Sequence, residues 1–236
     1  MAVLDVNIER AGYDDQQNAI QDLSFSILPG QLIGLIGPNG AGKSTTIKAI
    51  LRLLKNVKGK VQIAKSSANV AYIPERPVLY DGLTLWEHLE FAATVKGMER
   101  PYFEKRALEL LERFQLEKVK HQFPDHFSKG MQQKVMIIMG FLIPVDLYIV
   151  DEPFIGLDPK AVKVLMELLE EVKSQGAAIL MSTHVLDTAE KICDSFLLLN
   201  EGRLLAQGPL HKIREESNLP DGSLFDCFIA LVEAAE

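Results

Sequence analysis

Short apolar runs rich in Ile, Leu and Val recur along the chain, between longer segments whose apolar residues follow a helical period. Such runs are typical of strands that are buried on both faces. The runs predicted to be strands are Leu32–Ile36, Val70–Ile73, Leu147–Val150, Ala178–Met181 and Phe196–Leu199. Because strands that alternate with helices form a parallel sheet covered by those helices, the pattern predicts an α/β fold with a largely parallel sheet.

The clearest amphipathic helix starts at Ala161. Gly176 is placed to end it, since glycine is the preferred residue just after a helix. The apolar residues on one face of this helix are Val162, Leu165, Met166, Leu169 and Val172. The next predicted strand follows directly, as the alternation requires.

The stretch from Gly82 to Leu142 departs from this alternation, because it has helical segments and no strand-like run. We therefore predict a helical insertion. Its predicted helices are Leu85–Val95, Tyr102–Glu117 and Met131–Leu142, punctuated by Pro101 and Pro124. The tail after Leu210 is also predicted to be helical, and the residues from Ser223 to Asp226 have the pattern of a capping box that starts the last helix.

The composition is that of an ordinary globular protein. The chain has 236 residues, of which 47% are hydrophobic and 24% are charged, so it can bury a core and is not disordered. Its net charge of −7 argues against nucleic acid as a partner, because binding to a phosphate backbone needs a basic surface. An anionic ligand must instead be held by a local arrangement of donors.

The two cysteines, Cys193 and Cys227, are too few for a disulfide scaffold and lack a metal-binding spacing. The N-terminus has no apolar leader segment. The most apolar stretch, Val135–Val145, is about half as long as the roughly 20 residues of a membrane-spanning helix. We therefore expect a chain of the reducing cytosol that does not cross a membrane by itself.

The segment Gly37-Pro-Asn-Gly-Ala-Gly-Lys43-Ser44 fits the phosphate-binding pattern G-x-x-x-x-G-K-[ST]. It follows the first predicted strand and opens a helix predicted to run to Leu54, so its backbone amides and the helix dipole favour an anion. Lys43 would then reach the β- and γ-phosphates of a nucleotide, and the Ser44 hydroxyl would bind Mg²⁺. A dinucleotide-binding fold fits worse, because Thr45 stands where that motif has a third glycine or alanine.

Two carboxylates, Asp151 and Glu152, follow the strand predicted at Leu147–Val150, at the sheet edge where open α/β folds bind ligands. Adjacent acids at a strand end are usually only solvated. Beside a phosphate loop they form the second half of a site for Mg-nucleotide hydrolysis, where one serves Mg²⁺ and the other orients or deprotonates water. His184 ends the run that starts at Ala178, and it is either a structural histidine or a contact to a γ-phosphate.

One segment distinguishes among the classes of nucleotide hydrolase. His126-Phe-Ser128-Lys-Gly130-Met-Gln-Gln-Lys134 resembles the L-S-G-G-Q signature of ABC ATPases. Two further segments are similar to that family's D-loop and switch histidine, namely Gly156-Leu-Asp158 and Ser182-Thr-His184. The resemblance extends from Val3 to about Gly208. A monomeric P-loop kinase or GTPase would leave the signature-like segment unexplained.

The resemblance implies a P-loop NTPase fold, with a RecA-like core, an antiparallel β subdomain and an inserted ABC helical subdomain. It implies one ABC ATPase domain over residues 1–236. The core would comprise residues 1–81 and 146–209, the helical insertion with the signature residues 82–145, and a C-terminal helical tail residues 210–236.

The resemblance also implies roles for individual residues. It implies that Glu152 and His184 are catalytic. It also implies that Ser44, Asp151 and Glu75 bind Mg²⁺. The residues implied to bind ATP are Tyr13, Asn39, Gly40, Ala41, Gly42, Lys43, Ser44, Thr45, Glu75, Ser128, Gly130 and Asp158. Tyr13 takes the place of the aromatic residue that stacks on adenine, and Asp158 could equally be the N-cap of a helix.

Several segments resemble more narrowly the ATP-binding subunit of Ecs-type transporters of Gram-positive bacteria. They are Tyr72-Ile-Pro-Glu-Arg-Pro-Val-Leu-Tyr80, Leu83-Thr-Leu-Trp-Glu-His-Leu-Glu90, the signature-like segment, and Leu180-Met-Ser-Thr-His184. Two positions depart from the wider ABC pattern. Glu75 replaces the Q-loop glutamine, with a salt bridge to Arg76 as its structural alternative, and Lys129 replaces the first signature glycine, with Met131 where glutamine is usual.

The resemblance implies the ATPase subunit of an ABC transporter. Because the signature of one protomer faces the nucleotide of the other, two copies would form a homodimer around two Mg-ATP. A separate multi-spanning membrane subunit would dock on the helical insertion, on the cytoplasmic face of the cell membrane, and would act as an exporter. The alternative is a soluble, non-transport ABC ATPase that acts on ribosomes or DNA, but such proteins carry tandem cassettes or long coiled-coil insertions, which are not found here.

Overall fold

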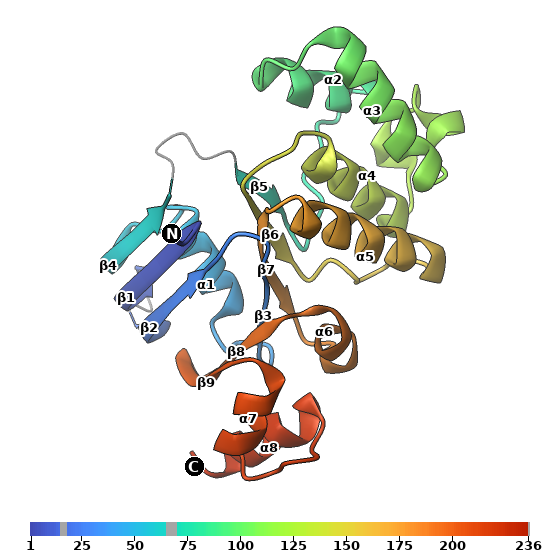
Figure 1. Cartoon of the computed structure of the whole chain (residues 1–236). Coiled ribbons are helices and arrows are strands. Elements are labelled where there is room, and N and C mark those ends of the chain that lie inside the picture. The colour runs from blue at the N-terminus through green and yellow to red at the C-terminus, as the bar shows by residue number, and fades with distance from the viewer. Residues whose placement is uncertain (15–17, 65–69, 236) are drawn as a thin grey trace.

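The computed structural model describes residues 1–14, 18–64 and 70–235. Two sheets lie at its centre, with helices around and between them (Figure 1). The smaller sheet is antiparallel in the order β2-β1-β4, with β1 at Leu4–Gly12, β2 at Ile20–Ile27 and β4 at Asn56–Ile63. Leu4, Val6 and Ile8 of β1 are buried, whereas Asp5 and Asn7 between them are exposed, which is the alternation of a sheet with one face on a core.

The larger sheet has the strand order β5-β6-β7-β3-β8-β9. Its strands are β3 (Leu32–Ile36), β5 (Val70–Ile73), β6 (Leu147–Asp151), β7 (Ala178–Thr183), β8 (Ser195–Asn200) and β9 (Arg203–Gly208). β9 is antiparallel to β8 and the other pairs are parallel. The α/β prediction is therefore confirmed. β9 was not among the predicted strands, because Arg203 and Gln207 keep it from forming a continuous apolar run.

Helix α1, at Lys43–Ile50, lies between the two sheets. Ile47 and Ile50 are buried in a core that they share with residues of β1, β2 and β3. The prediction that this helix runs to Leu54 is wrong. α1 ends at Ile50, and soon afterwards Arg52 takes up a left-handed backbone conformation, with φ of 58°.

Helices alone connect β5 to β6. They are α2 (Leu85–Val95), α3 (Arg100–Arg113), short 3₁₀ turns at Glu117–Val119 and Pro124–His126, and α4 (Lys129–Phe141). Residues 82–142 are all described and contain no strand, as predicted. The predicted bounds of α3 are wrong at both ends: Pro101 lies within its first turn, where its missing N–H costs nothing, and the chain leaves the helix before Gln115, whose φ is 60°.

The remaining helices are α5 (Pro159–Ser174), α6 (Leu186–Ile192), α7 (Leu210–Glu216) and α8 (Leu224–Glu233). The capping box predicted for α8 is confirmed, because Ser223 Oγ accepts a hydrogen bond from Asp226 N and Asp226 Oδ2 accepts one from Ser223 N. Across residues 1–14, 18–64 and 70–235, no helix has both the length and the apolar character needed to cross a membrane.

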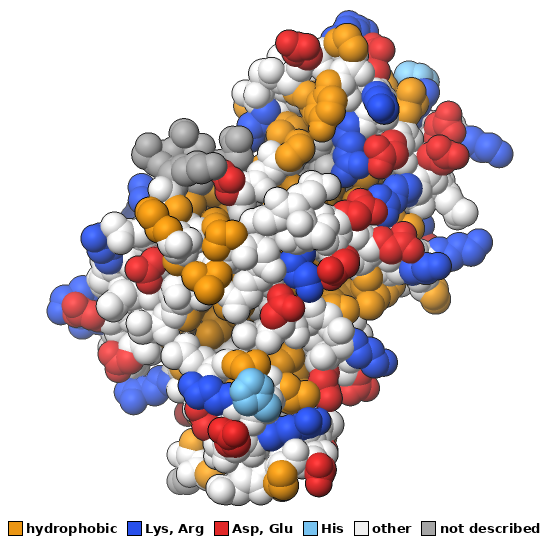
Figure 2. Space-filling view, in the orientation of Figure 1, with side chains coloured by type: hydrophobic (Ala, Val, Ile, Leu, Met, Phe, Trp, Pro, Cys, Tyr) orange, Lys and Arg blue, Asp and Glu red, His pale blue; other side chains and the backbone are white. Residues whose placement is uncertain are grey.

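Exposed apolar side chains gather around α2. Val78, Tyr80, Phe91 and Val95 are between 48% and 73% exposed, and we call these four residues the insertion patch. The rings of Tyr80 and Phe91 meet edge to face with centroids 5.7 Å apart, and buried His88 accepts a hydrogen bond of 2.8 Å from Tyr80 N. Figure 2 shows apolar side chains on the surface at this end of the molecule.

Candidate active site

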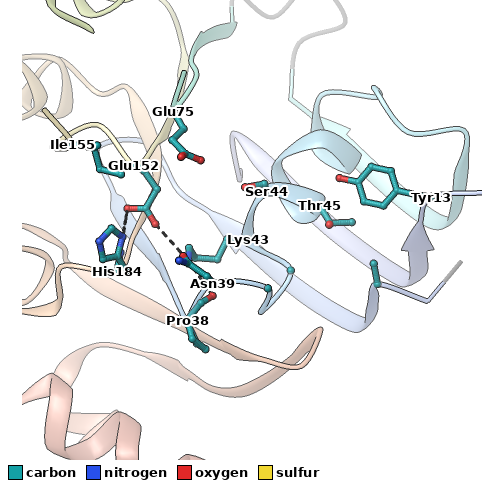
Figure 3. Close-up of a pocket in the computed structure, with 13 residues that line it drawn as sticks. Tyr13, Pro38, Asn39, Lys43, Ser44, Thr45, Glu75, Glu152, Ile155 and His184 are labelled. Atoms are coloured by element: carbon teal, nitrogen blue, oxygen red, sulfur yellow. Dashed lines mark hydrogen bonds and ion pairs between the residues drawn. The ribbon is translucent and has the colours of Figure 1, made fainter. Parts of the chain in front are cut away.

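A cavity of about 440 Å³ opens at one edge of the larger sheet. Most of its lining comes from the segments that follow the carboxyl ends of β3, β5, β6 and β7, while Tyr13 follows β1 and Ala19 precedes β2 of the smaller sheet (Figure 3). Parallel strands bring their carboxyl ends to one edge, which is where open α/β sheets bind ligands. The lining residues are Tyr13, Ala19, Pro38, Asn39, Gly40, Gly42, Lys43, Ser44, Thr45, Glu75, Glu152, Ile155 and His184.

The loop from Gly37 to Gly42 joins β3 to α1. Gly42 precedes the helix with φ of 103°, and a Cβ there would lie 2.6 Å from Ile20 Cγ2. Only glycine therefore fits this position without moving β2. The turn directs the free N–H groups at the start of α1 toward the cavity, and such groups bind phosphate.

The ammonium of Lys43 lies inside this loop. Its Nζ donates to Gly37 O at 2.6 Å and to Pro38 O at 3.2 Å, and it is 3.4 Å from Glu152 Oε1. The side chain is only 7% exposed. A buried ammonium inside a loop of this pattern is suited to bind the phosphates of a nucleotide.

Glu152 is held in an unusual backbone conformation just after β6, with φ of 47°. Its N–H donates to Ser182 O and Ser182 Oγ, both at 3.1 Å. Its carboxylate Oε2 accepts from His184 N at 3.2 Å and lies 2.8 Å from His184 Nδ1. Strained, fully partnered residues of this kind are concentrated at functional sites.

Asp151 lies beneath the cavity and is 4% exposed. Burial raises the pKa of its carboxyl, and the nearby charges of Glu152 and Glu75 act in the same direction, whereas a hydrogen bond from Ser182 and the charge of Lys43 lower it. Asp151, Glu75 and the Ser44 hydroxyl offer oxygen atoms of the kind that Mg²⁺ prefers as ligands. Among the described residues, no group of three or more His, Cys, Asp or Glu side chains is placed to hold a metal ion by itself.

Tyr13 stands at the opposite end of the cavity from Glu152 (Figure 3). Lys48 Nζ is 3.2 Å from the Tyr13 hydroxyl oxygen and 5.3 Å from the ring centroid. These two distances put the ammonium beyond the hydroxyl rather than over the ring. The contact is therefore a hydrogen bond to the hydroxyl rather than a contact with a face of the ring.

The remaining predicted residues lie outside the cavity lining. Ser128 is the N-cap of α4 and accepts from Met131 N at 3.3 Å. Asp158 is the N-cap of α5, as its structural alternative predicted, and accepts from Lys160 N and Ala161 N. Gly130 packs near Gly156, and Ala41 lies within the phosphate-binding loop with its side chain buried.

The role of Ser182 was not predicted, and the surroundings of Glu75 differ from its structural alternative. Ser182 contacts both Asp151 and Glu152. The one feature of the sequence that could have indicated this role is its position two residues before His184, at the end of a predicted strand. Glu75 lines the cavity, and among the ion pairs of the described residues there is none between Glu75 and Arg76.

Comparisons with known proteins agree on one family. A profile described as "ABC transporter" matches residues 20–155. The chain is 45% identical to the "ABC-type transporter ATP-binding protein EcsA" of Bacillus subtilis (strain 168), over 99% of this chain and 98% of that protein. It is 34% identical to the "SkfA peptide export ATP-binding protein SkfE" of the same organism, over 80% and 82%.

A solved structure described as "Structure of ATP binding subunit of ABC transporter" superposes with a TM-score of 0.93. The sequences are 46% identical, and the match covers 98% of this chain and 99% of that one. The similarity therefore includes the sheets, the helical insertion and the C-terminal helices.

Proposed function

Because the chain belongs to the ABC transporter family, as an ATP-binding subunit that hydrolyses ATP, we propose that two copies close around two Mg-ATP and drive a separate membrane subunit. The observation that carries the proposal is the division of the predicted site. Lys43, Glu152 and His184 meet in the cavity, whereas Ser128 and Gly130 lie outside its lining. A second copy would supply the signature residues that each cavity lacks.

Within one protomer, Lys43 and the amides of Asn39 to Thr45 bind the β- and γ-phosphates, and Tyr13 stacks on the base. Bound Mg²⁺ would neutralise phosphate charge next to Ser44, Asp151 and Glu75. Glu152 accepts a proton from water as the water oxygen attacks the γ-phosphorus and the bond to the leaving ADP oxygen breaks. His184, fixed against Glu152 at 2.8 Å, orients that carboxylate and contacts the γ-phosphate.

We assign the membrane subunit to the insertion patch. Contiguous exposed apolar side chains are typical of interaction sites, and in this patch the aromatic residues Tyr80 and Phe91 lie on a helix-supported surface. The same assignment locates the chain on the cytoplasmic face of the cell membrane. Export is the direction we propose, by analogy with the peptide-export name of the SkfE relative.

The same proposal extends to the division of the chain. Residues 1–81 and 146–209 would form the nucleotide-binding core, residues 82–145 the insertion that carries the signature, and residues 210–236 the tail. The insertion patch would then span the boundary between the core, which supplies Val78 and Tyr80, and the insertion, which supplies Phe91 and Val95. The helices between β5 and β6 support the boundaries of the insertion.

The test is ATP-dependent dimerisation of Glu152→Gln, in which hydrolysis is blocked. Sedimentation velocity should give a monomer without nucleotide and a dimer with Mg-ATP, because ATP binds the dimer more tightly than the monomer. Adding Ser128→Arg puts a bulky side chain at the proposed γ-phosphate seat and should keep the protein monomeric. A dimer that forms equally well with Ser128→Arg contradicts the proposal.

A further inference from the structure

A second cavity, of about 230 Å³, lies where the helical insertion meets α5 and β6. Its lining comes from α3, from the end of α4 with the chain that follows it, from β6, and from α5 with its C-cap. Among the described residues, none lines both this second cavity and the nucleotide cavity. The residues that line the second cavity are Tyr102, Lys105, Arg106, Glu109, Phe141, Pro144, Tyr148, Glu171, Val172 and Gln175.

The buried part of this lining is aromatic and apolar. Phe141 and Tyr148 are each 1% exposed, and their rings stack with centroids 5.0 Å apart. Val172 of α5 is also buried, whereas Tyr102 of α3 is 51% exposed. Small-molecule sites are typically lined in this way, by apolar and aromatic side chains with few polar groups among them. The second cavity is therefore suited to a ligand with an apolar ring.

The Tyr148 hydroxyl is a polar group within this apolar lining. Burial raises the pKa of Tyr148, whereas a hydrogen bond with the backbone of Val145 and the charge of Arg106 lower it. A hydrogen bond that lowers the pKa of a phenol is one that its oxygen accepts, so the Val145 N–H is the donor. Among the described residues, no hydrogen bond has the Tyr148 O–H as its donor. This buried O–H is therefore left for an acceptor on a ligand.

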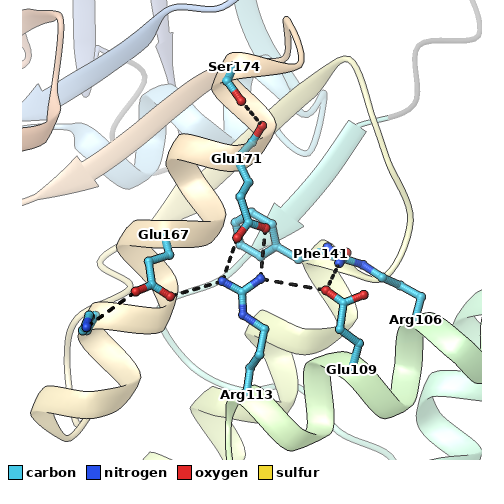
Figure 4. A network of polar contacts seen from close by, with 8 residues as sticks. Arg106, Glu109, Arg113, Phe141, Glu167, Glu171 and Ser174 are labelled. Atoms are coloured by element: carbon cyan, nitrogen blue, oxygen red, sulfur yellow. Dashed lines mark hydrogen bonds and ion pairs between the residues drawn. The ribbon is translucent and has the colours of Figure 1, made fainter.

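The two carboxylates of the lining are already paired with arginines (Figure 4). Arg106 Nη1 lies 2.7 Å from Glu109 Oε1, and its Nη2 donates to Phe141 O at 3.4 Å. Glu171 is paired with Arg113. A ligand cation would therefore have to displace an arginine to reach either carboxylate.

Lys105 is the other cation of the lining. It is exposed, and among the ion pairs of the described residues there is none that includes it. One unpaired positive charge matches a singly charged anion better than a phosphate, whose second charge would face Glu109 and Glu171. The charges of the lining therefore favour a carboxylate.

We propose that the second cavity binds a small aromatic carboxylate. Its ring would contact the apolar side chains that include Phe141 and Val172, and its carboxylate would accept hydrogen bonds from Tyr148 and Lys105. The volume of about 230 Å³ lies below the range for drug-sized ligands, which begins at about 300 Å³, so the ligand is a single ring with a short side chain. All of these residues belong to one protomer, so the site does not depend on the proposed homodimer.

The test is a ligand-observed NMR titration of the full chain with phenylacetate, in saturating Mg-ADP so that the nucleotide cavity is occupied. Phenylacetate should bind saturably with a Kd of about 1 mM or tighter, as expected for a ligand of about ten non-hydrogen atoms. Acetate, which lacks the ring, and phenethylamine, which carries the opposite charge, should each bind at least about tenfold more weakly. Equal binding of phenethylamine, or no saturation by phenylacetate at about tenfold above that Kd, would overturn the proposal.

Substitutions locate the site. Lys105→Met and Tyr148→Phe should each raise the Kd of phenylacetate by about fivefold, the usual effect of one hydrogen bond, and Tyr102→Ala should raise it as well. The controls are Lys163→Met, which removes a lysine whose side chain is 79% exposed, and Phe123→Ala, which removes a ring that is 44% exposed and outside the lining. Neither control should change the Kd.

The ADP affinity of every variant should stay at the wild-type value, which shows that the fold is intact. Lys105 and Tyr102 are exposed, so their replacement tests the site even where Tyr148→Phe lowers stability. If phenylacetate binds the Lys105→Met and Tyr102→Ala variants as tightly as the wild type, it binds elsewhere on the protein and the assignment to the second cavity is wrong.

Discussion

Lys43 is the residue whose partners bear most directly on nucleotide binding. Its ammonium is 3.4 Å from Glu152 Oε1, so a triphosphate that reaches the ammonium competes with this carboxylate and also meets its negative charge. The Glu152 carboxylate therefore opposes nucleotide binding even though the reaction needs it.

We expect Glu152→Gln to have two opposite effects. Turnover should fall by about 10²–10⁴-fold, because the amide cannot accept the proton from water. ATP affinity should rise by about fivefold, which corresponds to about 1 kcal/mol for a charge–charge contact of this kind. Isothermal titration in a Ser128→Arg background measures the affinity without dimerisation, and Lys43→Ala in that background should weaken binding. Equal affinity with and without Glu152→Gln would refute the competition.

Glu75 should affect the metal rather than the nucleotide. Burial is the main cause that raises the pKa of Asp151 and that raises the pKa of Tyr72 to about 12, and the charge of Glu75 adds to both. The Glu75 carboxylate therefore acts within the acidic corner of the cavity. Glu75→Gln should raise the Mg²⁺ concentration for half-maximal ATPase activity severalfold, because one carboxylate near the cation is lost. Arg76→Gln is the matched control. Unchanged Mg²⁺ dependence in Glu75→Gln would assign the residue a structural role.

The sequence identified the cavity residues better than it identified their partners. Lys43, Glu152 and His184 sit in short motifs at strand ends, and the shared edge of a parallel sheet brings strand ends together. Ser182 and the ion pair between Lys134 and Asp158 depend on how separate segments pack, which short motifs do not encode. Gly130, implied by the resemblance to bind ATP, lies beside Gly156 O within its own protomer, and its role toward a nucleotide stays a prediction.

At the scale of elements, α3 and α5 are joined by a polar cluster around Arg113 (Figure 4). Both terminal nitrogens of Arg113 contact Glu171, each at 2.9 Å, and Nη2 lies 3.4 Å from Glu167 Oε2. Glu109, paired with Arg106 at 2.7 Å, approaches Arg113 to 4.0 Å. The single positive charge of Arg113 therefore lies among three carboxylates at the junction between the insertion and α5.

We expect Arg113→Met to loosen this junction, because it leaves Glu109, Glu167 and Glu171 facing one another. The cost should lie between the roughly 1 kcal/mol of an exposed pair and the roughly 3 kcal/mol of a buried one, or a fall in Tm of several degrees for a chain of this size. Arg100→Met, which removes a side chain that is 74% exposed, is the control. Thermal unfolding at low and high salt compares them, and equal Tm values for the two variants would contradict the role of Arg113.

Element types were easier to predict than element ends. The strands of the larger sheet that are buried on both faces form apolar runs, whereas β1, β2 and β4 mix polar and apolar residues because one face of their sheet is solvated. The chain turns out of α1 and α3 near Arg52 and Gln115, which have positive φ without being glycine. No residue type signals such an end, so both helices were predicted too long.

At the scale of the whole molecule, the insertion patch and the C-terminal helices lie at opposite ends (Figure 1). Both ends carry exposed apolar side chains, with Val95 at 66% and Phe225 at 52% exposed. The proposed membrane contact uses the first end alone. The two ends therefore provide a matched pair of sites for the same substitution.

We expect Val95→Arg to release the chain from the membrane without impairing its ATP site. An arginine in the patch would leave a charge unpaired in an apolar interface, which costs several kcal/mol, and Val95 does not line the cavity. Tagged wild type and Phe225→Arg should sediment with the membranes of the host cell, whereas Val95→Arg should remain in the supernatant, although its Glu152→Gln version still dimerises with ATP. If Phe225→Arg is released and Val95→Arg is retained, the membrane subunit contacts the tail, and the assignment to the helical insertion is wrong.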